Sequence, residues 1–135
     1  MSAVLIDSNI LLDLMSDDAR WFDWSSKALE RAADRSRLVI NAEISIRFSR
    51  IEDLEAALPK DLLAREALPF EAAFLAGKCF LAYRRRRGDK RSPLPDFFIG
   101  AHAAVAGYQL LTRDTARYRT YFPKLPLITP APVLR

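Results

Sequence analysis

The chain has 135 residues, of which half are hydrophobic and 28% are charged, and this balance excludes a largely disordered chain. The length predicts one domain spanning residues 1–135. No apolar stretch approaches the ~20 residues that a membrane span needs, and no basic segment leads into an apolar signal core. We therefore expect a cytoplasmic protein without membrane contact.

The positive charge is concentrated in one short segment. The formal net charge is +4, yet "RRRRGDKR", residues 84–91, carries +5 by itself. Such a run is often a solvated helix end, and it is equally suited to holding RNA phosphates. We favour the RNA role because the segment leads directly into an acidic motif. The candidate RNA-binding residues are Arg85, Arg86, Arg87 and Arg91.

Apolar runs alternate with helical periodicity along the chain, which predicts βαβ units, a parallel sheet and the α/β class. The predicted strands are "AVLI" (3–6), "RLVI" (37–40), "QLLT" (109–112) and "PLIT" (126–129), with "EALPF" (66–70) as a weaker candidate. The predicted helices cover residues 21–34, 42–58, 71–86 and 95–107, and the opening strand also runs into a helix. The last strand, which lies in a proline-containing tail, is predicted at the sheet edge.

Acidic residues follow the predicted strands at the same end. Asp7 comes directly after the first strand, Glu43 three residues after the second, and Asp114 two residues after "QLLT". The carboxyl ends of parallel strands meet at one edge of a sheet, where ligands bind. A fourth acid, Asp96, stands in "SPLPDFFIGAHA", where Pro95 fits the first turn of a helix.

These four acids have two interpretations. Each one taken singly fits a helix N-cap or first turn, where Asp and Glu are favoured. Taken together, four carboxylates at one edge would repel one another, and a buried carboxylate is costly without a partner. A cluster of hard oxygen ligands suits Mg²⁺ or Mn²⁺. The set therefore predicts a cation site.

Four blocks of the sequence resemble the PIN-domain ribonucleases, most closely the VapC-type toxins of toxin–antitoxin pairs. The blocks are "VLIDSNILLDL", "INAEISIRFSRIEDLEAALP", "LPDFFIGAHAAVAGYQLLTRDTARYRTYFP" and "LPLITP", and they span nearly the whole chain in the expected order. The resemblance implies a three-layer α/β/α sandwich with a small parallel sheet. It also implies a metal-dependent endoribonuclease that cuts RNA phosphodiester bonds with a metal-activated water.

The resemblance assigns roles to individual positions. Asp7, Glu43, Asp96 and Asp114 match the four catalytic acids and metal ligands, with Mg²⁺, or alternatively Mn²⁺, as the cofactor. Whether one ion or two are held stays open. Ser8 and Asn9 match a polar pair after the first acid, and we expect Asn9 or Ser8 to cap the next helix and hold Asp7 in place. Thr112 matches a residue before the last acid, and we expect its hydroxyl group to orient a ligand carboxylate by a hydrogen bond.

Partners also follow from the resemblance. It implies an RNA substrate (tRNA, rRNA or mRNA), a VapB-like antitoxin that covers the active face, and a homodimer formed through helices of the first half of the chain. The alternative function is a non-catalytic RNA- or protein-binding module. A phosphatase with an aspartyl nucleophile would need a second acid two residues after Asp7, where Asn9 stands.

Three further residues receive structural interpretations. His102 lies six residues after Asp96, so helical geometry turns it away from that carboxylate, and we expect a structural role. Cys79, the one cysteine, stands at helical spacing among apolar residues and is predicted to pack in the core. Asp13 is predicted to be exposed on the first helix.

Overall fold

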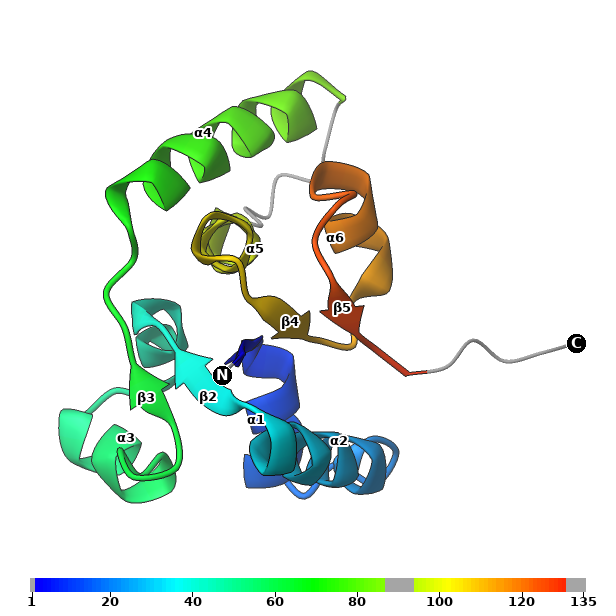
Figure 1. Cartoon of the computed structure of the whole chain (residues 1–135). Helices are drawn as coiled ribbons and strands as arrows, with labels where there is room; N and C mark the ends of the chain where they lie inside the picture. Colours follow the sequence, from blue (N-terminus) through cyan, green and yellow to red (C-terminus); the bar gives the residue numbers. More distant parts are fainter. Residues whose placement is uncertain (1, 87–93, 131–135) are drawn as a thin grey trace, which may run out of the picture.

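A five-stranded parallel sheet forms the centre of the protein, in a computed structural model that describes residues 2–86 and 94–130 (Figure 1). The strand order is β3-β2-β1-β4-β5, and every neighbouring pair is parallel. The predicted α/β class with a parallel sheet is therefore confirmed, and β5 is an edge strand as expected. The strands are β1 (Ala3–Ile6), β2 (Arg37–Ile40), β3 (Ala64–Arg65), β4 (Gln109–Leu111) and β5 (Leu127–Ile128).

Helices cover both faces of the sheet and make three layers (Figure 1). One layer holds α4 (Phe70–Arg85), α5 (Leu94–Ala106) and α6 (Thr115–Tyr121), and the other holds α1 (Ser8–Met15), α2 (Phe22–Arg35) and α3 (Ile51–Ala57). Within the described residues, no helix has the length and apolar character needed to cross a membrane.

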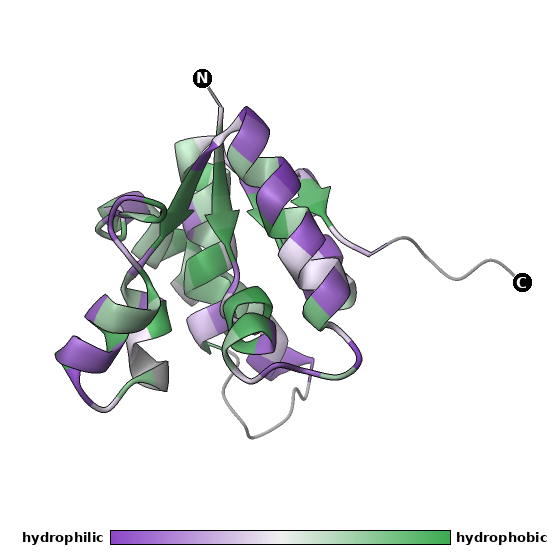
Figure 2. Ribbon diagram, turned by 90° about the horizontal axis from the view of Figure 1, so that it is seen from below, coloured by the Kyte–Doolittle hydropathy of each residue, from purple (hydrophilic) through white to green (hydrophobic). Residues whose placement is uncertain are grey.

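The sequence of β1 explains why two layers of helices are needed. Ala3 and Leu5 belong to the core beneath α4, α5 and α6, while Val4 and Ile6 belong to the core beneath α1, α2 and α3. Successive side chains of a strand point to opposite faces, so an unbroken apolar strand requires cover on both. Figure 2 shows these hydrophobic strands at the centre of the molecule. Cys79 of α4 is buried, as predicted.

The predicted helix over residues 42–58 is wrong. A 3₁₀ helix, η1 (Ala42–Arg47), is followed by extended backbone at Phe48, and α3 begins only at Ile51. Phe48 has φ −123° and ψ 134° and packs against the same core as Leu54, so the chain turns inward where a continuous helix would carry Phe48 elsewhere. Tertiary packing here overrides helical periodicity.

Two other differences concern short elements. The weak strand candidate at 66–70 is wrong, because β3 pairs Ala64 and Arg65 with the end of β2, and Pro69 is already the N-cap of α4. Helix α6 was not among the predicted helical ranges; Asp114 is its N-cap residue.

Candidate functional site

Asp7 lies where β1 ends and α1 begins. Its backbone N–H donates to the carbonyl oxygen of Leu111 at 2.9 Å, which fixes it beside the end of β4. The side chain is 2% exposed, and Oδ2 accepts hydrogen bonds from Thr112 Oγ1 at 2.7 Å and Tyr118 Oη at 3.0 Å. The carboxylate is thus held in one orientation by two hydroxyl donors from the β4–α6 region.

Burial gives Asp7 an unusual proton affinity. Desolvation, together with the nearby charge of Asp96, raises the pKa of Asp7 to about 6, although the Thr112 and Tyr118 hydroxyl groups act in the opposite direction. Hydroxyl donors stabilise a carboxylate but add no positive charge to balance it. Asp7 therefore has the character of a buried anion that a cation would stabilise.

Glu43 stands in the first turn of η1 and is half-buried. Desolvation and the charge of Asp96 raise the pKa of Glu43. The side chain of Asn41 caps η1 by accepting the backbone N–H of Glu43 at 3.0 Å, and its Nδ2 lies 3.1 Å from Nδ1 of His102 in α5. His102 is fully buried, and its contact with Asn41 supports the backbone that carries Glu43.

Asp96 and Asp114 are joined by an arginine that sequence reasoning missed. Asp96 is in the first turn of α5, and Asp114 is the N-cap residue of α6. Arg117 Nη1 forms an ion pair with Asp96 Oδ2 and lies 3.5 Å from Asp114 Oδ2. The backbone N–H of Asp114 also donates to Thr112 Oγ1 at 3.0 Å. The Thr112 hydroxyl group therefore bonds both the Asp7 carboxylate and the Asp114 backbone.

The four predicted acids converge on one edge of the sheet. Burial raises the pKa of Tyr118 well above its usual value, and the charges of Asp7, Asp96 and Asp114 add to that rise. Asp96 in turn acts on Glu43. The sequence signal for Arg117 and Tyr118 is their spacing, since residues three and four positions after an acid share its helix face.

Oxygen donors of this kind fit a hard divalent cation, and the raised pKa of buried Asp7 fits a group that needs one. In the present arrangement, however, no three acidic, histidine or cysteine side chains of the described residues lie close enough together to hold a metal ion. Arg117 bonds Asp96 and Asp114 instead. Arg117 and a divalent ion would therefore share the same two carboxylates as partners.

The prediction that Asn9 or Ser8 caps α1 needs correction. Neither Ser8 nor Asn9 caps α1, because Asp7 is the N-cap residue and both follow it inside the helix. The Asn9 side chain reaches across to Thr112 Oγ1 and the backbone N–H of Arg113, each at 3.4 Å.

The prediction that Asp13 is exposed is also wrong. The residue is 2% exposed and accepts hydrogen bonds from Ser25 and Arg113. The α1 helix turns this position toward α2 and the β4–α6 loop, so burial is compensated by a full set of partners.

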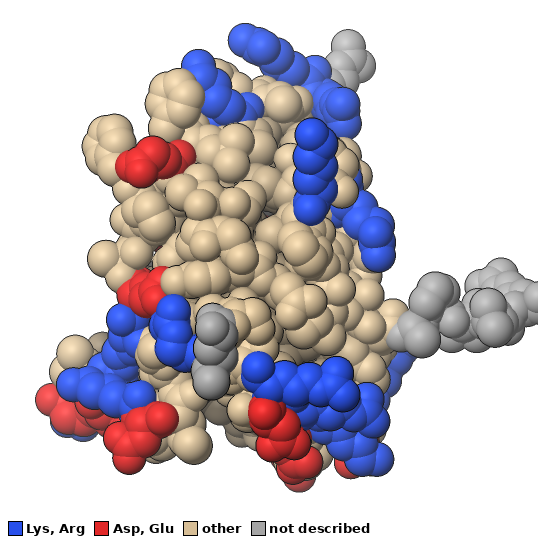
Figure 3. Space-filling model, viewed as in Figure 1, with Lys and Arg blue, Asp and Glu red and all other residues tan. Residues whose placement is uncertain are grey.

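Two of the four candidate RNA-binding arginines can be placed. Arg85 ends α4 and Arg86 is its C-cap residue, and both are exposed. Arg86 also lies 5.6 Å from the ring of Tyr121 in α6. Figure 3 shows Lys and Arg side chains gathered over this end of the molecule. Arg87 and Arg91 lie outside the described residues.

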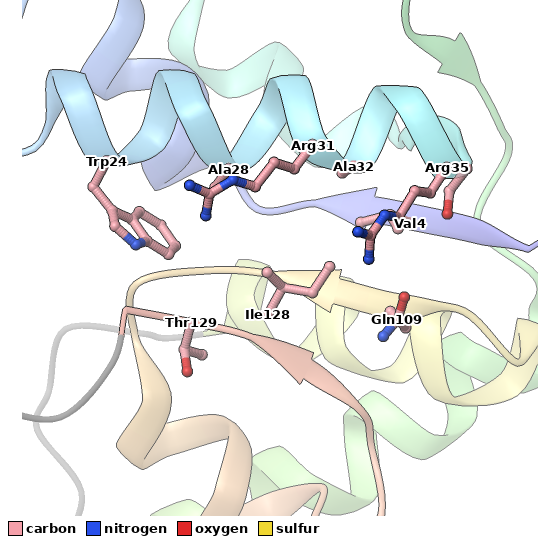
Figure 4. Close-up of a pocket in the computed structure, with 10 residues that line it drawn as sticks. Val4, Trp24, Ala28, Arg31, Ala32, Arg35, Gln109, Ile128 and Thr129 are labelled. Atoms are coloured by element: carbon pink, nitrogen blue, oxygen red, sulfur yellow. The ribbon is translucent and has the colours of Figure 1, made fainter.

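A pocket of about 320 Å³ between α2 and the edge of the sheet is distinct from the acids. Figure 4 shows the Arg35 guanidinium group pointing from α2 toward the sheet, the Arg31 side chain running along α2, and Trp24 at one end of the pocket. None of the described residues that line this pocket carries a carboxylate. It does not contain any of the predicted catalytic residues.

The chain matches the PIN domain over residues 4–123 and therefore belongs to the PIN-domain family. Comparison with curated proteins gives no significant match. Among solved structures, it is similar to VapBC2 of Rickettsia felis bound to a promoter DNA fragment, with 15% identity, 94% of this chain and 98% of that chain covered, and a TM-score of 0.68.

Two further structures show the same fold. DNA-bound VapBC of Salmonella typhimurium has 14% identity, a TM-score of 0.66, and coverage of 96% of this chain and 98% of the other. A toxin–antitoxin complex of Klebsiella pneumoniae has 22% identity, a TM-score of 0.63, and coverage of 96% and 99%. The predicted three-layer PIN-like fold is confirmed.

Proposed function

We propose that this protein is a metal-dependent endoribonuclease, the toxin of a type II toxin–antitoxin system acting in the cytoplasm. The observation that carries the proposal is the convergence of Asp7, Glu43, Asp96 and Asp114 at one sheet edge of a PIN-domain chain. All four are proposed catalytic residues and ligands of Mg²⁺ or Mn²⁺.

A bound divalent ion would activate a water and stabilise the charge that develops on the phosphate. Neighbouring residues of the chain hold the proposed metal ligands in position. Thr112 and Tyr118 hold the Asp7 carboxylate in place, and Asn41 fixes the first turn that carries Glu43. The exposed arginines at the end of α4 supply charge for the RNA backbone.

The decisive experiment is a cleavage assay on tRNA, rRNA and mRNA with metal-stripped protein, to which Mg²⁺ or Mn²⁺ is restored. We expect cleavage only with metal, and loss of most cleavage in Asp96→Asn, since an amide is a poorer ligand for a hard cation. Asp23→Asn, at an exposed position of α2, is the matched control. Metal-dependent cleavage that survives in Asp96→Asn would exclude Asp96 from the proposed ligands, whereas a folded parent that cleaves no RNA with either ion would leave a non-catalytic RNA- or protein-binding module.

The partner in this proposal is a VapB-like antitoxin that covers the active face. The similar structures from Rickettsia felis and Salmonella typhimurium are VapBC complexes bound to DNA, which supports a partner of this kind. We expect the complex with a co-expressed antitoxin to lack nuclease activity. A complex that cleaves RNA at the rate of the free chain would contradict this placement.

The proposal includes a homodimer, and one helix face suggests how two copies meet. Phe70, Phe74 and Leu81 of α4 are 84%, 64% and 48% exposed, and helical spacing places them on one face. Gly77 lies on the same face with open space above it. This face lies just beyond the midpoint of the chain, whereas the sequence analysis favoured helices of the first half.

The charges beside this face are complementary to those of a second copy of the chain. Glu71 and Lys78 flank it on one side, both exposed. In an antiparallel pairing about a two-fold axis, Glu71 of each copy approaches Lys78 of the other, and Phe74 of each covers Gly77 of the other. Self-complementarity of this kind favours a homodimer at α4.

A further inference from the structure

Arg117 lies between two of the acids at the site. Its guanidinium pairs with Asp96 and approaches Asp114, so it touches two of the four proposed ligands. Its side chain is 31% exposed, and those of Asp96 and Asp114 are 29% and 39% exposed.

The positive charge of the Arg117 guanidinium reduces the repulsion between the nearby carboxylates. Carboxylates brought together favour protonation or a bound cation, because like charges destabilise the ionised forms. Arg117 supplies a permanent charge and planar donors that match a carboxylate. In this arrangement, Arg117 provides the neutralisation that a divalent ion would also provide.

The surroundings allow this contact to be exchanged. Tyr118, the next residue of α6, is fully buried and bonded to Asp7, so the backbone of α6 is anchored. The Arg117 side chain is partly solvated by comparison, and ion pairs of partly exposed groups are worth little once solvent screening is included. The arginine can therefore leave its acids without unfolding the helix.

We infer that Arg117 is a positioning residue that holds Asp96 and Asp114 in the metal-free protein and sets the metal affinity of the site by competing with the divalent ion for them. This inference rests on the proposed metal site. Its consequence is that removing the guanidinium strengthens metal binding, although it removes a favourable ion pair.

The test is Mn²⁺ binding to metal-stripped protein, measured by isothermal titration calorimetry and by electron paramagnetic resonance of free Mn²⁺, with no RNA present. We expect Arg117→Gln to bind Mn²⁺ roughly tenfold more tightly, which corresponds to about 1.4 kcal/mol. Arg119→Gln is the matched control, because Arg119 is an exposed residue of the same helix and its loss changes the net charge equally. It should bind Mn²⁺ almost as the parent does.

The outcomes separate the inference from the proposed function. If the parent binds Mn²⁺ and Arg117→Gln binds it equally or more weakly, the inference is wrong and the metal site stands. The inference also fails if Arg119→Gln gains affinity by the same factor, since the effect is then one of net charge. A folded parent that binds no Mn²⁺ overturns both. If Arg117→Gln does not fold, we expect Arg117→Ala to bind Mn²⁺ more tightly than the parent by the same factor. Arg117→Lys should bind Mn²⁺ more tightly than the parent by a smaller factor. A folded variant that binds Mn²⁺ with parental affinity overturns the inference.

Discussion

Asp13 and Arg113 lie 100 positions apart and form a two-point ion pair, with Nε to Oδ2 at 2.7 Å and Nη2 to Oδ1 at 2.8 Å. Ser25 Oγ of α2 donates to the same Oδ2 at 2.6 Å, and the Arg113 guanidinium lies 4.9 Å from the ring of Trp21. Arg113 stands between Thr112 and Asp114. The pair therefore ties the loop that carries two proposed site residues to α1 and α2.

Breaking this pair should affect both stability and the site. Arg113→Gln leaves buried Asp13 without its cation, and we expect a loss of about 3 kcal/mol in the free energy of unfolding. Urea unfolding followed by circular dichroism measures it. Glu52→Gln, which removes an exposed surface pair at 3.3 Å with Arg50, should cost almost nothing. Equal, small effects in the two variants would show that the buried pair contributes no more than a surface pair.

The raised pKa of Asp7 predicts a particular dependence of stability on pH. A carboxyl whose pKa rises from 3.8 to about 6 on folding contributes stability that is fully present below pH 3.8 and lost as pH rises through about 6. At pH 7 the cost of ionised Asp7 is about 3 kcal/mol. Asp7→Asn, which can still accept both hydroxyl hydrogen bonds, should therefore stabilise the metal-free protein at pH 7 but not at pH 4.

Thermal unfolding of the parent and of Asp7→Asn between pH 4 and pH 7 isolates the contribution of Asp7 to the pH dependence of stability. The acids with lowered pKa, such as Glu55 and Glu66, titrate alike in both proteins and cancel. A stability difference that stays constant from pH 4 to pH 7 would contradict a raised pKa. Saturating Mn²⁺ should reverse the order at pH 7 by stabilising the parent more.

The basic segment should determine how RNA affinity responds to salt. If the arginines hold phosphates, their replacement by Ala weakens binding to many RNA sequences and reduces the log–log salt slope by ~0.7 per lost contact. Filter binding over a range of KCl concentrations measures the slope. Mn²⁺ binding without RNA should not change. The variant replaces Arg85, Arg86, Arg87 and Arg91.

The control for this experiment removes cations elsewhere. Arg31→Ala with Arg35→Ala takes two exposed arginines from α2, on the opposite helix layer from α4. This double variant should keep the parental slope. An unchanged slope and affinity in the variant that lacks the four arginines of the basic segment would place the RNA groove on another surface.

The α4 face should control assembly. Phe74→Ser removes an exposed ring, so it should leave the monomer folded while raising the dimer dissociation constant, and Gly77→Lys should do the same by filling the open space opposite that ring. Sedimentation equilibrium measures both. Val105→Ser, at an exposed apolar position of α5, is the control. A dimer that persists unchanged in both α4 variants would locate the contact elsewhere.

Features of this protein that depend on local residue pattern could be predicted from the sequence. The strands at 3–6 and 37–40 were predicted with their observed bounds, because short apolar runs of this length between polar boundaries are typical of strands buried on both faces. The positions of Asp7, Glu43 and Asp114 after parallel strands then predicted one acidic edge, since all such strands end on the same side.

Features that depend on contacts between distant residues could be seen only in the folded structure. Asp13 lies on a helix whose local pattern does not distinguish an exposed acid from a buried one, and its state depends on an arginine from the far end of the chain. The break after η1 depends on where Phe48 packs. The ion pair between Arg117 and Asp96 is known only once α5 and α6 are placed together, because the two residues lie 21 positions apart and no local spacing relates them.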